Sequence, residues 1–324
     1  MKKHKKLKIA IIFILLILFA AYWTVIYFLV DAVLVPSFME QLQDFQRISE
    51  KGYSELVYTD DITENQAAET AIMREWFQET QKEKLTRIND DGYRLVAVKF
   101  THEKPVGKWV LLLHGYTGIK EMMYIYAMHY YEWGYDVLVP DLRCQGESEG
   151  DYIGMGLTDA YDCIGWLDVI LTEDPRADIV IHGQSMGAAC ALIMSGMPEL
   201  PQQVSHIVSD ASYTDAYTMF GEKAGEWFSL PAFPFVDSVR LMLLVRGGYD
   251  LYDASALDAV KKSRIPTLFI HGDADRMISV DQAYELYDAA SCEKKLLIVE
   301  GAGHGQANYK DPENVYGVIY DWIG

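Results

Sequence analysis

The stretch that most constrains the fold runs from Ile179 to Cys190 and reads IVIHGQSMGAAC. A short β-branched run leads through a Gly-x-Ser-x-Gly pattern into small helix-forming residues. It predicts a buried strand over 178–182, a sharp turn at Ser185 and a helix over 186–194. In such a turn the serine backbone is strained, which raises the hydroxyl above the sheet edge. This geometry explains why residues 183 and 187 are glycine, because the strand and the helix pass too closely there for a Cβ.

This pattern is informative because of the order of predicted strands and helices around it. Gly-x-Ser-x-Gly alone arises by chance in roughly one chain in ten of this length. A hairpin is predicted around Asp90-Asp91-Gly92, between strands over 85–89 and 94–101. Further strands are predicted over 109–113, 136–139, 204–208, 267–271 and 295–299, and helices over 122–133, 157–171, 280–290 and 312–323. Such alternation predicts an α/β fold with a mostly parallel central sheet and helices on both faces.

One long segment, 212–262, interrupts the alternation. It contains several aromatic residues and prolines but no obvious strand. An insertion of this kind predicts a helical cap over the C-terminal edge of the sheet, where ligands bind in open α/β folds. We expect most of its aromatic side chains to pack and a few to line a pocket.

The N-terminus carries the second strong signal. Residues 9–30 contain no charged side chain, and a helix over them is long enough to cross a bilayer core of about 30 Å. Five lysines lie in the basic tail, 1–8, and the positive-inside rule therefore predicts a single-pass signal anchor in the cell membrane, with the N-terminus cytoplasmic and the catalytic domain extracytoplasmic. A cleaved signal peptide is the alternative. The length of the run and the bulky Tyr22-Trp23 after Ala20-Ala21 disfavour it.

Residues 31–81 form a juxtamembrane segment with helical spacing over 38–48 and 68–77. We expect this segment to space the following domain from the bilayer and then to dock on it, with a platform for a partner protein as the alternative. The predicted organisation is therefore tail, anchor, juxtamembrane segment and an α/β domain over 82–324.

The charge balance limits the partners of the chain. Lys and Arg number 28 against 47 Asp and Glu, a formal net charge of -19. A nucleic-acid partner is disfavoured because phosphate backbones bind cationic patches. The cysteines are Cys144, Cys163, Cys190 and Cys292. Their spacing favours structural thiols over a metal site, although an extracytoplasmic location would permit a disulfide.

Three loops that each follow a predicted strand carry a nucleophile, an acid and a base in the chain order Ser, Asp, His. Ser185 would attack a carbonyl carbon, His304 would take its proton, and Asp275 would orient the imidazole. Asp273 and Asp210 compete with Asp275 for the role of the acid, and the spacing of the Gly-x-x-Asp turn favours Asp275.

His304 is the preferred base because it lies in a glycine-rich loop, where an exposed imidazole can approach a serine. His114 and His182 adjoin important loops, but their places at strand ends suit structural hydrogen bonds better. The backbone N–H groups of Tyr116 and Met186 are the predicted oxyanion donors. No metal or organic cofactor is implied.

At these residues the sequence resembles the α/β-hydrolase superfamily, in its Bem46-like and serine aminopeptidase-like bacterial branch. The resemblance covers roughly 85–324. It rests on His114-Gly115-Tyr116-Thr117-Gly118, on Asp141-Leu142-Arg143, on the segment around Ser185, on Gly272-Asp273-Ala274-Asp275 and on Gly301-Ala302-Gly303-His304. Similar sequences usually have glycine where this chain has Cys144. The resemblance implies the fold and the Ser-His-Asp triad, whereas the substrate stays open.

The sequence thus predicts a membrane-anchored serine hydrolase that cleaves small or lipid-like acyl esters through an acyl-enzyme. A peptidase or amidase with the same triad is the first alternative, and it would need a site for a substrate terminus, such as an acidic cluster in the cap. A non-catalytic binding protein on the same scaffold is the second. It is disfavoured because a scaffold has no physical need for all three groups.

Overall fold

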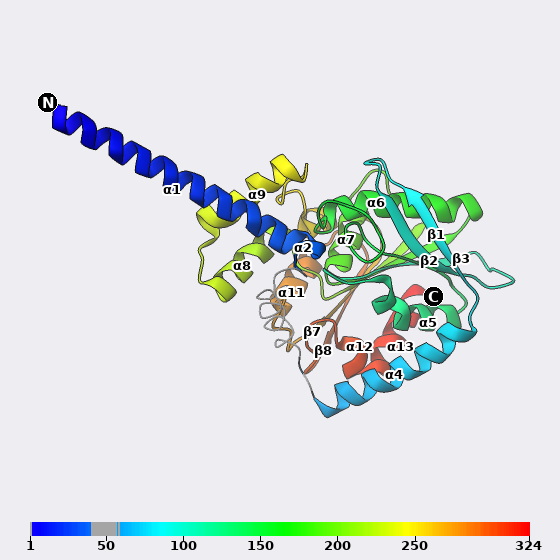
Figure 1. Cartoon of the computed structure of the whole chain (residues 1–324). Helices are drawn as coiled ribbons and strands as arrows, with labels where there is room; N and C mark the ends of the chain where they lie inside the picture. The colour runs from blue at the N-terminus through cyan, green and yellow to red at the C-terminus, as the bar shows by residue number, and fades with distance from the viewer. Residues whose placement is uncertain (1, 40–56, 58) are drawn as a thin grey trace.

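The fold is seen in a computed structural model, which describes residues 2–39, 57 and 59–324 (Figure 1). Within these residues the strands form an eight-stranded sheet in the order β1-β2-β4-β3-β5-β6-β7-β8. The strands are β1 (Lys82–Ile88), β2 (Arg94–Phe100), β3 (Lys108–Leu113), β4 (Asp136–Pro140), β5 (Asp178–Gln184), β6 (Val204–Asp210), β7 (Thr267–Gly272) and β8 (Lys294–Val299). Strand β2 pairs antiparallel with β1 and β4, and all other pairs are parallel. The predicted hairpin and mostly parallel sheet are confirmed.

Helices cover both faces of this sheet. One face carries α6 (Leu157–Glu173), α7 (Met186–Ser195), α10 (Ala256–Val260) and α11 (Val280–Ala289), and their apolar side chains join one buried cluster. The other carries the short η1 (Lys120–Met123), α5 (Tyr124–Glu132) and α13 (Pro312–Ile323), which share a second cluster. The sheet thus separates two cores, as expected for a parallel sheet buried on both sides.

The predicted strands are in place, but β5 and β6 extend two residues beyond their predicted ends. Parallel pairing continues through Gly183 with Ser209 and Gln184 with Asp210. Glycine and polar residues of this kind are typical of loops, so the sequence predicted that both strands end two residues earlier. The extension carries β5 to the residue before Ser185.

The insertion between β6 and β7 is helical, as predicted. It contains α8 (Ala216–Phe228), α9 (Ala232–Arg246) and α10. The Gln282 amide at the start of α11 donates to Glu222 on α8 at 3.0 Å, and its carbonyl accepts from the backbone N–H of Thr214 at 2.9 Å. The cap is therefore tied to the helix that follows the Asp275 loop.

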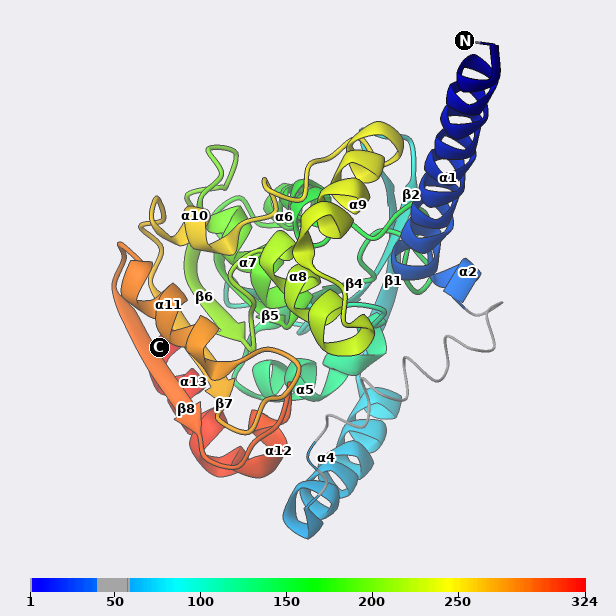
Figure 2. The same cartoon turned by 90° about the vertical axis from the view of Figure 1, so that its left-hand side faces the viewer.

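The N-terminal helix α1 (Lys2–Leu34) projects from the body in both views (Figures 1 and 2). Its residues Lys5–Leu34 are long and apolar enough to cross a membrane, and an 18-residue window within them has a mean hydropathy of 2.8. The helix continues beyond the predicted anchor, and α2 (Pro36–Met39) follows it. Ile26, Val30 and Leu34 are at most 1% exposed and belong to the cluster under α6 and α7. The end of α1 thus packs directly on the α/β domain, without the expected spacer.

Helix α4 (Asp60–Glu79) includes the helix predicted over 68–77 and contacts α5. Asp60 and Asp61 occupy its first turn, where carboxylates stabilise the helix dipole. Near its other end the ring of Phe77 stacks on Tyr124, with centroids 5.0 Å apart. The helix predicted over 38–48 falls almost wholly outside the described residues, apart from the last residues of α2.

Asp159 in the first turn of α6 makes the stability of the fold dependent on pH. Its side chain is fully buried. One oxygen accepts the N–H of Gly156 at 2.8 Å, and the other has no partner among the described residues. Burial raises the pKa of this carboxyl from 3.8 to about 7. The folded chain therefore keeps a proton that the unfolded chain releases.

We expect the free energy of unfolding to fall between pH 4 and 8 by on the order of 2 to 4 kcal/mol. The stabilisation from the neutral Asp159 carboxyl is complete below the pKa of this group in the unfolded chain, and it is lost as pH rises through the pKa of the group in the folded chain. Asp159→Asn, which stays neutral, should flatten this dependence in urea titrations. Asp168→Asn, at an exposed position of the same helix, should leave it unchanged. A parallel decline in the Asp159→Asn variant would contradict the assignment.

Candidate active site

Ser185 occupies a sharp turn between β5 and α7, as predicted. Its backbone has φ 56° and ψ -118°, a conformation that costs a non-glycine residue on the order of 1 to 3 kcal/mol. A Cβ on Gly183 would collide with the carbonyl of Gly187, and one on Gly187 would collide with that of Leu113. The two glycines thus allow the close strand and helix crossing that holds the serine in its strained position.

The loops after β7 and β8 bring Asp275 and His304 to this serine. His304 Nε2 lies 2.8 Å from Ser185 Oγ, and His304 Nδ1 lies 2.8 Å from Asp275 Oδ2. Because a carboxylate only accepts, Nδ1 carries a proton and Nε2 is free to accept one from the serine. The three residues singled out in the sequence therefore form one continuous hydrogen-bonded chain.

Asp275 is held by more donors than the histidine alone. Its side chain has no exposed surface, and Oδ1 accepts the backbone N–H groups of Met277 at 2.8 Å and Ile278 at 2.9 Å. Burial alone would raise the pKa of this carboxyl, but His304 and His271 outweigh burial and hold the pKa well below its usual range. Asp275 is thus a fixed carboxylate over the whole neutral range.

His271 is a neighbour of the site that the sequence reasoning missed. Its Nε2 lies 3.1 Å from Asp275 Oδ2 and 3.0 Å from the carbonyl oxygen of Ile278. Both partners are acceptors, so Nε2 carries a proton. Burial would lower the pKa of His271, and the contact with Asp275 raises it overall. The only sequence signal was its place at the end of β7, four residues before Asp275.

The two competing acids lie elsewhere. Asp273 accepts the N–H of Gly301 at 2.6 Å and so braces the loop that leads to His304. Asp210 at the end of β6 accepts from Tyr126 at 2.9 Å and from the Gln184 amide at 3.3 Å. Burial raises the pKa of Asp210, and these bonds lower it only in part. Neither carboxylate is hydrogen-bonded to His304.

The two predicted oxyanion donors belong to the residue after the serine and to the loop that follows Gly115. Met186 is the first residue of α7, so its N–H belongs to the helix end that has no acceptor within the helix. A Cβ on Gly115 would come within 3.7 Å of Ser185 Oγ, which places the loop just before Tyr116 against the serine. The Tyr116 hydroxyl donates to the carbonyl of Val33 in the last turn of α1. The end of the N-terminal helix therefore anchors this loop.

His114 and His182 make structural contacts instead. The Nε2 of His114 accepts the N–H of Leu142 at 3.0 Å and its Nδ1 donates to Gly115 O at 2.8 Å, which fixes the loop ahead of Tyr116. His182 is fully buried, with Nδ1 3.2 Å from the hydroxyl of Tyr130. Burial lowers the pKa of His182 to about 3, so it stays neutral.

The loop that carries His304 is also held by the chain that precedes β1. The Gln306 side chain donates to Val57 O and accepts from Val57 N, each at 3.1 Å. The following short helix α12 (Ala307–Lys310) contacts α4, where Asn65 Nδ2 donates to Tyr309 O at 2.8 Å. Part of the chain before the α/β domain thus supports the loop of His304.

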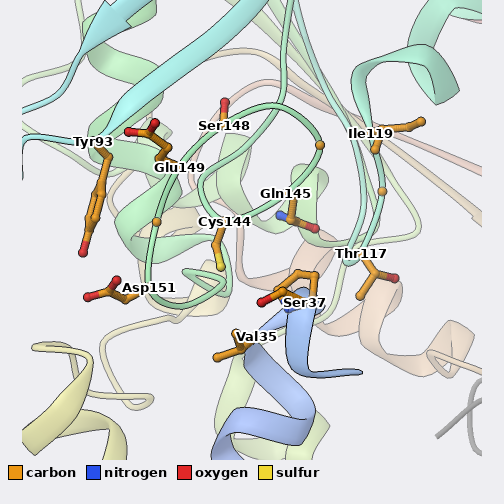
Figure 3. Close-up of a pocket in the computed structure, with 14 residues that line it drawn as sticks. Val35, Ser37, Tyr93, Thr117, Ile119, Cys144, Gln145, Ser148, Glu149 and Asp151 are labelled. Atoms are coloured by element: carbon orange, nitrogen blue, oxygen red, sulfur yellow. The ribbon is translucent and has the colours of Figure 1, made fainter. Parts of the chain in front are cut away.

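A cavity of about 680 Å³ lies beside the Tyr116 loop, between the end of α1 and the loop after β4 (Figure 3). Val35, Thr117, Cys144 and Asp151 line it, but Ser185 and His304 do not. Cys144 has φ 61°, a left-handed conformation that favours glycine. The loop therefore keeps a backbone turn suited to the glycine usual in similar sequences.

Two buried ion pairs hold the loop after β4 to the domain. Arg143 donates to both oxygens of Asp162, at 2.6 and 3.0 Å, and Lys120 Nζ lies 2.7 Å from Asp141 Oδ2. All four cysteines are free, and Cys163 and Cys190 are buried in helices as expected of structural thiols.

The sheet topology, the strained turn after β5 and the cap define this chain as a hydrolase of the α/β type. It belongs to the alpha/beta hydrolase family, which matches residues 110–318. A Bacillus subtilis protein, YqkD, is 25% identical over 68% of this chain and 72% of its own. The caffeoylshikimate esterase of Arabidopsis thaliana is 24% identical over 66% and 76%. The solved Pyrococcus furiosus esterase Pf2001 has a TM-score of 0.62 at 19% identity, covering 77% of this chain and 95% of its own. This structural likeness concerns the fold.

Proposed function

We propose that the chain is a membrane-anchored serine hydrolase that cleaves carboxylic esters. The observation that carries this proposal is the hydrogen-bonded chain from Ser185 through His304 to Asp275, with 2.8 Å at both links. The backbone N–H groups of Tyr116 and Met186 are the proposed donors to the oxyanion. Esterases among the relatives and solved structures support the ester class without fixing a substrate.

The geometry implies the steps of the reaction. Ser185 Oγ attacks the ester carbonyl carbon while His304 Nε2 takes its proton, and the negative oxygen that forms is stabilised by the two N–H donors. His304 then gives the proton to the leaving alcohol, which departs and leaves an acyl group on Ser185. Water attacks the acyl-enzyme with His304 again as the base, which releases the acid and restores the serine. Asp275 keeps the imidazole in the required tautomer throughout.

Helix α1 is the proposed anchor, with the N-terminus in the cytoplasm and the hydrolase domain outside the cell. Most of the apolar side chains before Ala20 are more than half exposed, so the described part of the chain leaves them uncovered. The residues from Ile26 to Leu34 complete the hydrolase core, which favours a retained helix over a cleaved signal peptide. The lysines ahead of the helix support the orientation.

A fluorophosphonate probe tests the serine mechanism on the full chain in detergent. We expect one adduct, located on Ser185 by peptide mass spectrometry, and its disappearance in Ser185→Ala. Absence of labelling on folded wild-type protein would exclude both ester hydrolysis and amide hydrolysis by this triad.

A comparison of substrates separates the ester class from the amide class. p-Nitrophenyl esters of increasing chain length should be cleaved faster than aminoacyl anilides. The reverse order would favour the peptidase alternative, which uses the same three residues.

A further inference from the structure

Helix α9 of the cap packs alongside α1, the proposed anchor (Figure 2). The Tyr22 hydroxyl lies 2.7 Å from Ser238 Oγ in the middle of α9. At the other end, Arg246 Nη2 lies 2.7 Å from Asp31 Oδ1, and its guanidinium lies over the ring of Tyr27. These contacts run in the same direction along both helices, so the stretch of α1 from Tyr22 to Asp31 lies level with the stretch of α9 from Ser238 to Arg246.

The level of these contacts relative to the bilayer follows from helix length. A hydrocarbon core of about 30 Å takes about 20 helical residues. A core that begins at Ile9, directly after the last lysine of the tail, therefore ends near Phe28. The contact at Tyr22 then lies about 9 Å inside the hydrocarbon, whereas the ion pair of Arg246 and Asp31 lies just outside it, at the headgroups.

The surface of α9 suits these depths. Its exposed side chains include Phe233 at 76%, Leu241 at 48%, Leu244 at 46% and Val245 at 75%, while Val236, Val239 and Leu243 face the core. The sequence from 227 to 236, at the deep end, contains no charged residue.

The charged side chains of α9 begin beyond this run and have partners. Asp237 accepts from the Tyr217 hydroxyl at 3.1 Å, and Arg240 donates to Asp250 at 2.5 Å. Asp237 and Arg240 lie near the level of Tyr22, and both are bonded within the protein. An apolar face that lies next to a membrane helix, with the charged side chains of its own helix paired in this way, has the properties of a surface buried in lipid.

We infer, on the basis of the proposed membrane anchor, that the exposed face of α9 and the turn before it lie among the acyl chains of the bilayer. The cap then stands between the bilayer and Ser185. Its companion helix α8 reaches the Asp275 loop, where Lys223 Nζ lies 3.3 Å from Arg276 O. The substrate class that fits this placement is an acyl ester that resides in the membrane and enters from the lipid side.

Depth-dependent quenching tests the placement directly and does not depend on catalysis. Phe233→Cys and Val245→Cys are labelled with an environment-sensitive fluorophore in the full chain, reconstituted in phosphatidylcholine vesicles. Val106→Cys, at 69% exposure in the loop before β3, is the matched control, and labelled wild type gives the contribution of native thiols. We expect lipid-borne nitroxides to quench both cap positions several-fold more than position 106, at low and high ionic strength alike.

Equal quenching of all three positions by aqueous iodide would overturn the inference. So would a disulfide between two copies at position 245, which would mean that a second chain covers this face.

In a second arm, Phe233→Glu should lower the ratio of hydrolysis of a long-chain ester in vesicles to that of a short soluble ester about 10-fold, because a carboxylate resists entry into hydrocarbon. Val106→Glu should leave that ratio unchanged. An unchanged ratio in Phe233→Glu would contradict entry of the substrate from the lipid side. If the wild type had no activity on either ester, the proposed function would be contradicted, and the quenching result would remain valid.

Discussion

Replacing Ser185 by alanine is expected to lower kcat for a short p-nitrophenyl ester by about 10⁵ to 10⁶-fold, the range found when a triad nucleophile is removed. The reason is geometric, since Ser185 Oγ is the hydroxyl that His304 Nε2 faces at 2.8 Å. Alanine keeps the small side chain that the turn requires, so the fold should survive. Steady-state kinetics and a thermal unfolding curve on the same preparation measure both effects.

Ser195→Ala is the matched control because Ser195 lies at the far end of α7 and donates to Leu192 O at 2.6 Å. Its turnover should remain within a few-fold of wild type. A Ser185→Ala variant that is folded and keeps more than about one hundredth of the wild-type kcat would place the nucleophile elsewhere.

The second large effect is expected for Asp275→Asn, which should reduce kcat by about 10³ to 10⁴-fold. The asparagine amide can turn a donor toward His304 Nδ1, which favours the tautomer with its proton on Nε2 and leaves no base for the serine. Substrate binding should change far less, because Asp275 is fully buried behind the histidine. The measurement is kcat and KM over a pH series.

Asp273→Asn provides the control for the neighbouring acid. Asp273 bonds the Gly301 N–H and not the imidazole, so we expect less than about a 10-fold loss from a looser loop. If Asp273→Asn were the more damaging variant, or if Asp210→Asn were, the acid would have been assigned to the wrong carboxylate.

The sequence allowed the sheet and the triad loops to be predicted because each depends on a local pattern. Short apolar runs of strand length mark β3 through β8, and the carboxyl ends of parallel strands meet at one edge. Residues that follow β5, β7 and β8 must therefore lie near one another, whatever their separation in the chain. The catalytic roles of Ser185, Asp275 and His304 stay predictions until the kinetics are measured.

The supports of the site could not be predicted, because they join residues with no shared pattern. His271 is one of eight histidines, and only the folded loop shows that its Nε2 faces Asp275. The pairing of Gln306 with Val57 spans 249 positions in the chain. The packing of α9 on α1 could not be predicted for a related reason. A membrane segment is recognised because it is apolar on all sides, so its sequence does not show which side contacts protein.

The contacts of Val33 and Val57 have a practical consequence for producing the enzyme. A common route to a soluble sample removes the apolar N-terminus and begins the recombinant chain at the first strand. Here that cut would take away the acceptor of the Tyr116 hydroxyl and both backbone partners of Gln306, and it would strip the stacked Phe77 from Tyr124. A shortened chain that begins at β1 would thus be purified with both sides of its proposed catalytic centre unsupported, and weak turnover in such a sample would be a property of the cut.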